Sequence, residues 1–256
     1  MSETETPTTK TALVTGASRG IGRAIAERLA RDGVLVAVHF GQNDAAAKDV
    51  VAGIEAVGGR AFAVRGDLGS TDFDTLLEDV DAGFADLGAP VGLDILVNNA
   101  GMTVMKGVDT MTAAEFDTLF ATNVRAPFFL VQGALDRLRD GGRVVNLSSA
   151  VTRMAFPDIL AYTMTKGAID SFTRVLAQTL GPRGITVNAV APGYVVTDMN
   201  AWLIDNPEGQ REASSNVALG RVGHPADIAD IVSYLVSDDA RWITGQTLDA
   251  SGGTAL

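Results

Sequence analysis

The sequence contains no cysteine, which excludes disulfide bonds, thiolate catalysis and cysteine-ligated metals. Histidine is nearly as scarce: His39 and His224 are the only two and lie far apart in the chain, so we expect no metal site. No lysine or arginine run stands out and the net charge is −11, which argues against nucleic-acid or anionic-membrane partners. No apolar stretch reaches the ~18 residues of a membrane span, and the start of the chain lacks the basic and apolar regions of a signal peptide. We therefore expect a cytoplasmic protein with a flexible tail over residues 1–10.

Short apolar runs alternate along the chain with longer segments of helical period. The longer segments carry apolar residues at three- and four-residue spacing, and most end at glycine, a common helix stop. Such alternation predicts βαβ units and a parallel sheet. No linker divides the chain, so we expect a single α/β domain over residues 11–256, a Rossmann-type doubly wound sheet of about seven parallel strands flanked by helices. The expected strands cover residues 11–16, 34–40, 61–67, 93–101, 142–149, 184–193 and 245–253.

Two segments depart from this rhythm. Residues 112–139 are expected to form one long helix that is apolar on more than one face, as a helix buried against both a sheet and a second subunit would be. Residues 198–224 are irregular and follow the sixth expected strand directly. Ligands bind at the carboxyl edge of open sheets, so we expect this insertion to be a substrate lid.

The stretch "TGASRGIG", residues 15–22, follows the first expected strand and opens the first helix. Gly16, Gly20 and Gly22 permit a tight turn and let a phosphate approach the backbone amides at a helix N-terminus. The spacing G-x-x-x-G-x-G differs from the commoner dinucleotide fingerprint G-x-G-x-x-G. Its place in the first βα unit nevertheless predicts a nucleotide site.

The charge at the end of the second strand indicates which dinucleotide binds. NAD-binding folds usually carry an acidic residue there, which holds the ribose hydroxyls and would repel a 2′-phosphate. Here the strand ends with Phe40, Gly41 and Gln42, and no carboxylate follows until Asp44. Arg19 in the glycine turn can supply a guanidinium to the phosphate. Both features favour NADP(H) over NAD(H).

Tyr162 and Lys166 lie four residues apart in a predicted helix, so they share one face. An adjacent ammonium lowers the pKa of a phenol, and a phenol tuned in this way can exchange a proton with a carbonyl oxygen. Ser148 and Ser149 end the fifth expected strand at the same edge as the glycine turn, where a hydroxyl can orient a substrate oxygen. No histidine lies nearby in sequence, so a serine–histidine hydrolase is not supported.

Taken in order, these motifs resemble the short-chain dehydrogenase/reductase family. The resemblance extends from Thr11 to Gly253. It rests on "TGASRGIG", "DL" at 67–68, "NNAG" at 98–101, "ATN" at 121–123, Ser149, "YTMTK" at 162–166 and "APGYVVTDM" at 191–199.

The resemblance implies a catalytic tetrad of Asn123, Ser149, Tyr162 and Lys166. Tyr162 would be the acid/base, and Ser149 would orient the carbonyl. Lys166 would lower the pKa of the phenol and bind the nicotinamide ribose, while Asn123 would hold a water of the proton relay. The positions assigned to the cofactor are Gly16, Ser18, Arg19, Gly20, Ile21, Gly22, Phe40, Gly41, Asp67, Leu68, Asn99, Ala100, Gly101, Tyr162, Lys166, Pro192, Gly193, Val195 and Thr197.

The substrate pocket is inferred from the neighbourhood of these motifs and is mostly apolar. Its expected wall consists of Met102, Val104, Arg153, Met154, Phe156, Tyr194 and Trp202. Family members are commonly tetramers that pair the helices around 112–139 and 157–180, so a homotetramer is expected.

Three functions remain open. The first is NADPH-dependent reduction of a ketone to a secondary alcohol. The second is 3-oxoacyl-[acyl-carrier-protein] reduction, whose enzymes dock an acidic carrier through surface arginines. Arg183 stands where one such arginine is expected, but Asp140 occupies the position of the other, and a net charge of −11 would repel an acidic partner. The third is a cofactor-binding regulator without turnover, which the intact tetrad disfavours.

Overall fold

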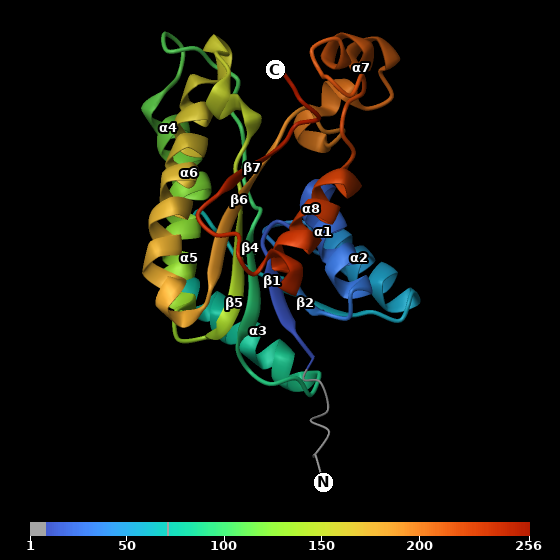
Figure 1. Cartoon of the computed structure of the whole chain (residues 1–256), viewed down its shortest axis with the longest axis vertical. Helices are drawn as coiled ribbons and strands as arrows, with labels where there is room; N and C mark the ends of the chain where they lie inside the picture. The colour runs from blue at the N-terminus through green and yellow to red at the C-terminus, as the bar shows by residue number, and fades with distance from the viewer. Residues whose placement is uncertain (1–8, 71) are drawn as a thin grey trace.

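A single sheet organises the chain, and all of its strands run parallel in the order β3-β2-β1-β4-β5-β6-β7 (Figure 1). The computed structural model describes residues 9–70 and 72–256, so the expected tail over 1–10 lies almost wholly outside the described residues. The chain builds outward from β1 to β3, returns to β4 beside β1, and then builds outward to β7, which places a topological switch point between β1 and β4. The strands are β1 (Thr11–Val14), β2 (Leu35–Phe40), β3 (Arg60–Arg65), β4 (Leu93–Asn98), β5 (Leu138–Leu147), β6 (Thr186–Pro192) and β7 (Thr247–Ala250).

Helices cover both faces of the sheet, and a separate apolar core lies under each set. One set is α1 (Gly20–Arg31), α2 (Asp44–Ala56) and α8 (Pro225–Val236). The other is α3 (Phe73–Asp86), α5 (Ala126–Ala134) and α6 (Leu160–Leu180). The three-layer, doubly wound α/β fold expected from the alternation is therefore confirmed.

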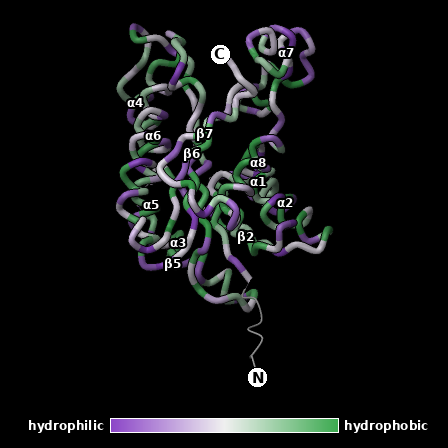
Figure 2. The backbone as a smooth tube through the Cα atoms, viewed as in Figure 1, coloured by the Kyte–Doolittle hydropathy of each residue, from purple (hydrophilic) through white to green (hydrophobic). Residues whose placement is uncertain are grey.

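Strand periodicity explains how one strand serves both cores. In β1, Ala12 and Val14 pack against the α1 side, whereas Leu13 between them packs against the α3 side. All three are fully buried, as expected for a parallel strand covered on both faces. In Figure 2 the flanking helices alternate between hydrophobic and hydrophilic residues along their length, as helices with one buried face do. Among residues 9–70 and 72–256, no helix is long and apolar enough to cross a membrane.

The expected long helix over 112–139 is interrupted. Thr112 and Glu115 form a capping box that starts α4 (Ala113–Phe120), a π-helical turn η1 (Ala121–Arg125) follows, and α5 ends before β5 begins. Pro127 lacks the amide hydrogen that would bond the carbonyl of Asn123, and its ring crowds that carbonyl. The backbone hydrogen bonds just before the proline therefore follow the wider π-helical pattern. The helical period of the sequence continues through this turn and does not reveal it. Strand β5 also starts at Leu138, before the expected residue 142, with a register shift against β4.

The insertion expected to be irregular contains helical structure. It holds a 3₁₀ segment η5 (Asp198–Leu203) and the helix α7 (Pro207–Ser214), which Figure 1 shows at the top of the molecule. Leu203, Ala213 and Val222 form a small apolar cluster of its own. The remaining short 3₁₀ segments are η2 (Ala150–Arg153), η3 (Pro157–Ile159), η4 (Gly181–Arg183) and η6 (Asp238–Ala240).

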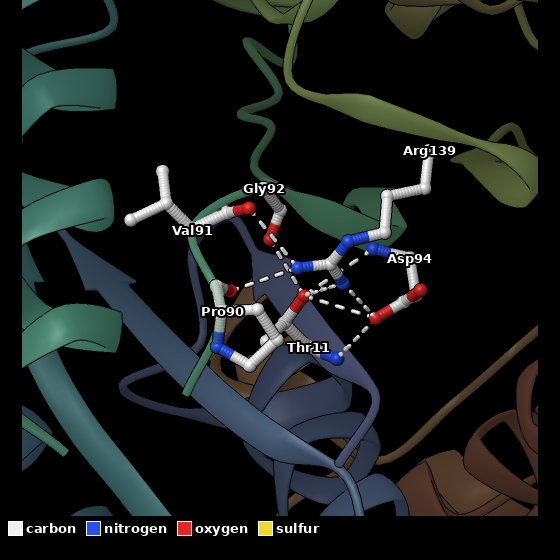
Figure 3. A network of polar contacts seen from close by, with 6 residues as sticks. All are labelled: Thr11, Pro90, Val91, Gly92, Asp94 and Arg139. Carbon is white, nitrogen blue, oxygen red and sulfur yellow. Dashed lines mark hydrogen bonds and ion pairs between the residues drawn. The ribbon is translucent and has the colours of Figure 1, made fainter. Parts of the chain in front are cut away.

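A polar network ties together the amino ends of β1, β4 and β5 (Figure 3). Asp94 accepts hydrogen bonds from the Thr11 amide at 2.7 Å and from the Arg139 guanidinium. The Thr11 hydroxyl donates to the Gly92 carbonyl at 2.7 Å, and Arg139 also donates to the carbonyls of residues 90–91. Hydrogen bonds to charged groups contribute about 1.5–3 kcal/mol each, so this network fixes the amino edge of the sheet. The site described next lies at the opposite edge.

Candidate active site

The carboxyl ends of β1, β4, β5 and β6 bring the predicted segments to one edge of the sheet. The glycine turn follows β1, residues 99–101 follow β4, Ser148 and Ser149 follow β5, and residues 193–197 follow β6. Parallel strands end at the same edge, and ligands of open α/β sheets bind at a switch point such as the one between β1 and β4. Segments separated by more than 170 residues are thus neighbours in space.

The glycine turn packs so closely that side chains do not fit at two of its positions. A Cβ on Gly22 would lie 2.3 Å from the Gly16 carbonyl oxygen and 2.4 Å from Asn99 Nδ2. A Cβ on Gly16, whose φ is +63°, would lie 2.9 Å from the Cα of Ala100. Asn99 Nδ2 in turn donates to the Thr15 carbonyl at 2.8 Å. Residues 15–16 and 99–100 therefore pack closely against each other at this edge, and we call them, with the rest of the glycine turn, the glycine cradle.

This cradle fits a dinucleotide phosphate. Helix α1 begins at Gly20 without any side-chain cap, so its first amides are open to an anion. Thr197 lies beside the turn, since a Cβ on Gly20 would be 3.5 Å from its Cγ2. At the same edge the buried Ser148 hydroxyl has no hydrogen-bond partner among the described residues. An uncapped helix N-terminus beside open backbone amides is the environment that a pyrophosphate needs.

The structure also places the residues that predicted the choice of dinucleotide. Phe40 ends β2 with its side chain buried in the core, so only its backbone can face a cofactor. Gly41 and Gln42 follow it as exposed residues, and neither carries an acid. Arg19 extends from the turn and pairs with Asp198 at 3.4 Å, with 74% of its side chain exposed. A guanidinium without a neighbouring β2 carboxylate favours a 2′-phosphate.

Several of the remaining predicted cofactor positions lie in turns or in the core beside the sheet edge. Asp67 Oδ1 accepts from the Gly69 amide at 2.9 Å, which closes a turn after β3. Leu68 and Val195 are buried, and Ile21 packs partly against the first core. Gly193 packs against Ser251 and Thr254, so the residues after β7 contact the turn that follows β6.

The four residues of the predicted tetrad converge through hydrogen bonds. Asn123 is buried in the π-helical turn, where its side chain bonds both the amide and the carbonyl of Met102 at 2.9 Å. Lys166 Nζ donates to the Leu147 carbonyl at 2.7 Å and lies 5.5 Å from the centre of the Tyr162 ring. The Ser149 hydroxyl lies near enough to the Tyr162 phenol to lower its pKa. A serine, a phenol and an ammonium therefore face one point at the sheet edge.

The pKa of Tyr162 is set mainly by burial. Burial raises the pKa of Tyr162 to about 12, and the Ser149 hydroxyl only partly opposes this. Burial also lowers the pKa of Lys166 to about 8, while the Asp170 carboxylate acts to raise it. Desolvation disfavours the charged form of each group. At neutral pH the phenol holds its proton, which is the form that can donate to a carbonyl oxygen.

We expect Asp170→Asn to shift the pH profile of ketone reduction. Asp170 favours the ammonium, so its loss lowers the pKa of Lys166 further below its ordinary value. The alkaline limb of kcat/KM, measured from about pH 6 to about pH 10, should then move to lower pH. Asp158→Asn, an exposed change in η3, should leave the limb in place. An unmoved limb in Asp170→Asn would show that Lys166 does not control it.

Two supporting residues escaped the sequence analysis. Thr165 is fully buried, accepts a hydrogen bond from Asn123 Nδ2 at 3.1 Å and donates to the Tyr162 carbonyl at 2.7 Å. It thereby joins the π-helical turn to α6. Asp170 lies one turn beyond Lys166, and that spacing could have signalled it. Nothing in the sequence signals the bond between Thr165 and Asn123, because 42 residues separate them.

The expected substrate wall falls into two groups. Tyr194 and Trp202 contact each other edge to face, 6.0 Å between ring centres, at the start of the insertion. Across the site, Arg153 forms an ion pair with Asp249 of β7, and Phe156 is partly exposed. Met102 is held through its backbone by Asn123, whereas Val104 and Met154 are partly exposed in loops. The wall as a whole remains a prediction.

A glycine cradle for a dinucleotide and a serine–tyrosine–lysine cluster, on one edge of a doubly wound sheet, define the class of nicotinamide-dependent oxidoreductases. Comparison with known proteins agrees. The family described as enoyl-(acyl carrier protein) reductase matches residues 16–255. The short chain dehydrogenase/reductase AacuN of Aspergillus aculeatus is 40% identical, over 95% of each chain. This chain belongs to the short-chain dehydrogenase/reductase family, as the motifs predicted.

Two further relatives bear on the reaction. A 3-oxoacyl-[acyl-carrier-protein] reductase of Staphylococcus aureus is 40% identical, over 96% of this chain and 98% of that protein. The crystal structure of the angucycline C-6 ketoreductase LanV with bound NADP is 49% identical, with a TM-score of 0.91 over 96% of this chain and 95% of that one. The predicted enzyme class and the NADP preference agree with these relatives.

Proposed function

We propose that this protein uses NADPH to reduce a ketone on a fused-ring aromatic substrate to a secondary alcohol. The observation that carries the proposal is the convergence of Ser149, Tyr162 and Lys166 beside the glycine cradle. The similarity to an angucycline ketoreductase supports the substrate class.

Each residue of the cluster has a distinct task in this reaction. When bound, the reduced nicotinamide supplies the hydride that goes to the carbonyl carbon. Ser149 donates a hydrogen bond that orients the carbonyl oxygen, and Tyr162 delivers its phenolic proton to that oxygen. The Lys166 ammonium stabilises the phenolate left behind. Asn123 anchors Met102 and Thr165, which holds the loop after β4 against α6.

The cofactor would lie across the switch point between β1 and β4. The α1 amides and the backbone around Gly16 and Gly20 would receive the pyrophosphate, and Arg19 the 2′-phosphate. Asp67 and Leu68 would border the adenine, and residues 99–101 would lie along the dinucleotide. Residues 192–197 would hold the nicotinamide end.

The surroundings favour a free aromatic ketone over a carrier-bound thioester. The candidate wall carries the aromatic rings of Phe156, Tyr194 and Trp202. Arg183, the expected carrier-docking arginine, instead pairs with Asp140 at 2.8 Å and donates to the Leu135 carbonyl at 2.8 Å. Its charge is thereby neutralised locally, and the chain carries a net charge of −11. An acidic carrier protein would meet little attraction at this surface.

The domain organisation and the assembly belong to the same proposal. Residues 11–256 form one catalytic domain, with 198–224 as a lid over the substrate, because the insertion follows β6 at the site edge and has its own small core. A homotetramer is supported by the half-exposed Phe128 and Phe129, which line a groove of about 620 Å³ on α4, η1 and α5. A cytoplasmic location suits a consumer of NADPH.

NADPH oxidation should be measured with three substrates: a fused-ring aromatic ketone, an acetoacetyl thioester and a small aliphatic diketone. We expect kcat/KM for the aromatic ketone to exceed that for the thioester at least about tenfold, a difference of about 1.4 kcal/mol in transition-state binding. Preference for the thioester would overturn the substrate class and restore fatty-acid or polyketide chain reduction. NADPH binding without turnover of any ketone would instead favour a regulatory role.

A further inference from the structure

His39 is a buried histidine that the proposed reaction does not use. It lies in β2, is 2% exposed, and is one of only two histidines in the sequence. Both of its ring nitrogens are engaged: the Gly16 amide donates to Nδ1 at 3.1 Å, and Nε2 lies 3.2 Å from the Gly66 carbonyl oxygen. The His39 carbonyl also accepts from the Ala17 amide at 2.8 Å.

The partners fix the protonation state of this ring. An amide can only donate, so Nδ1 must be an unprotonated acceptor, and a carbonyl can only accept, so Nε2 must carry the proton. Burial lowers the pKa of His39 to about 4, which keeps the imidazole neutral near pH 7. The charged neighbours at the end of β3 and in the turn after it have other partners: Arg65 donates to the Gly41 carbonyl, and Asp67 accepts from the Gly69 amide. Leu76 of α3 packs beside Gly66 and adds no charge.

The two partners of His39 belong to two halves of the cofactor site. Gly16 is the first glycine of the phosphate cradle and has a left-handed φ of +63°. Gly66 directly precedes Asp67 and Leu68, the segment assigned to the adenine. A Cβ on Gly66 would lie 3.0 Å from His39 Nε2, so this segment packs tightly on the ring. One neutral imidazole therefore spans from the turn after β1 to the turn after β3.

We propose that His39 is a positioning residue that sets the separation of the phosphate cradle and the adenine segment before NADPH binds. The inference rests on the proposed NADPH binding. Preorganised sites bind more tightly because the ligand does not have to order them. Both hydrogen bonds of the His39 ring go to backbone groups of the cofactor-site turns, so we expect its contribution to fall on cofactor affinity and not on hydride transfer.

The test compares His39→Phe with His39→Gln and with Val64→Ala. Phenylalanine fills the space but leaves the Gly16 amide and the Gly66 carbonyl unpaired, whereas glutamine retains a donor and an acceptor. Val64 is buried opposite His39 in β3, so its truncation controls for lost packing. We expect His39→Phe to raise the fluorescence-titrated Kd for NADPH roughly tenfold or more, with kcat at saturating NADPH within about twofold. The Kd of His39→Gln should lie between those of the wild type and His39→Phe. Val64→Ala should lower the melting temperature without raising the Kd.

Three outcomes overturn the inference: an unchanged Kd in His39→Phe, an equal rise in Val64→Ala, or a loss of kcat with Kd preserved. Nitrogen-15 NMR of the wild-type imidazole provides a test that does not depend on a variant folding. We expect an unprotonated, hydrogen-bonded Nδ1 and a protonated Nε2, and the reverse tautomer would also overturn it. If the wild-type protein itself failed to bind NADPH, the proposed function would fail instead, and the NMR result would stand separately.

Discussion

Replacing Tyr162 with phenylalanine is expected to lower kcat for ketone reduction about a thousandfold, the usual scale of a lost general acid. Phenylalanine keeps the ring and removes only the phenolic hydroxyl. With its pKa raised to about 12, the phenol is protonated throughout the neutral range and serves as an acid. Without it, the developing alkoxide must take its proton from water. The Kd for NADPH should change less than about twofold, because the loss falls on the transition state.

Tyr234→Phe is the matched control for this experiment. Tyr234 lies on α8 and is 45% exposed. Its substitution removes the same phenolic hydroxyl, but outside the site. We expect its kcat to equal that of the wild-type protein. If Tyr162→Phe retained more than about a tenth of wild-type turnover, the assignment of Tyr162 as the proton donor would be wrong.

Gly22→Ala is expected to raise the Kd for NADPH about a hundredfold, since misplacement of a binding group by about 1 Å can cost that much. The added methyl would lie 2.3 Å from the Gly16 carbonyl oxygen, and a backbone atom cannot rotate away. The turn must therefore move off the segment that contains Asn99 and Ala100. The measurement is a fluorescence titration of NADPH, with circular dichroism to establish that the variant is folded.

Gly53→Ala provides the contrast. Gly53 lies within α2 and is exposed, and a Cβ there would meet no described atom within 4 Å apart from its chain neighbours and the backbone of its own helical turns. Alanine at such a helix position should leave the Kd unchanged and stabilise the protein by about 0.5–1 kcal/mol. A Gly22→Ala protein that bound NADPH like the wild type would contradict the assignment of the cradle.

Local patterns in the sequence determined most of the architecture. The apolar runs and helical periods predicted all of the sheet strands, and the spacing of Gly16, Gly20 and Gly22 predicted the cradle. The interval between Tyr162 and Lys166 predicted that both face one side of a helix. These inferences succeeded because periodicity, glycine φ values and i,i+4 neighbours depend on a few consecutive residues.

Errors arose where a neighbour distant in sequence decides the outcome. The pKa of Tyr162 depends on burial by the surrounding segments, which the spacing between Tyr162 and Lys166 does not express. The helix over 112–139 is interrupted by the π-helical turn before Pro127, and the helical period of the sequence does not reveal that turn.

The sequence by itself thus determined the sheet, the order of its strands along the chain and the edge of the sheet at which the glycine turn, Tyr162 and Lys166 meet. Only the tertiary structure decided which groups at this edge are shifted in pKa by burial and which residues are joined by hydrogen bonds between segments. It joined Asn123 to Thr165, Arg183 to Asp140 and His39 to both Gly16 and Gly66. The physical reason is that desolvation and hydrogen bonding between segments depend on distances through space, and those are fixed only when the whole sheet and its helices have packed.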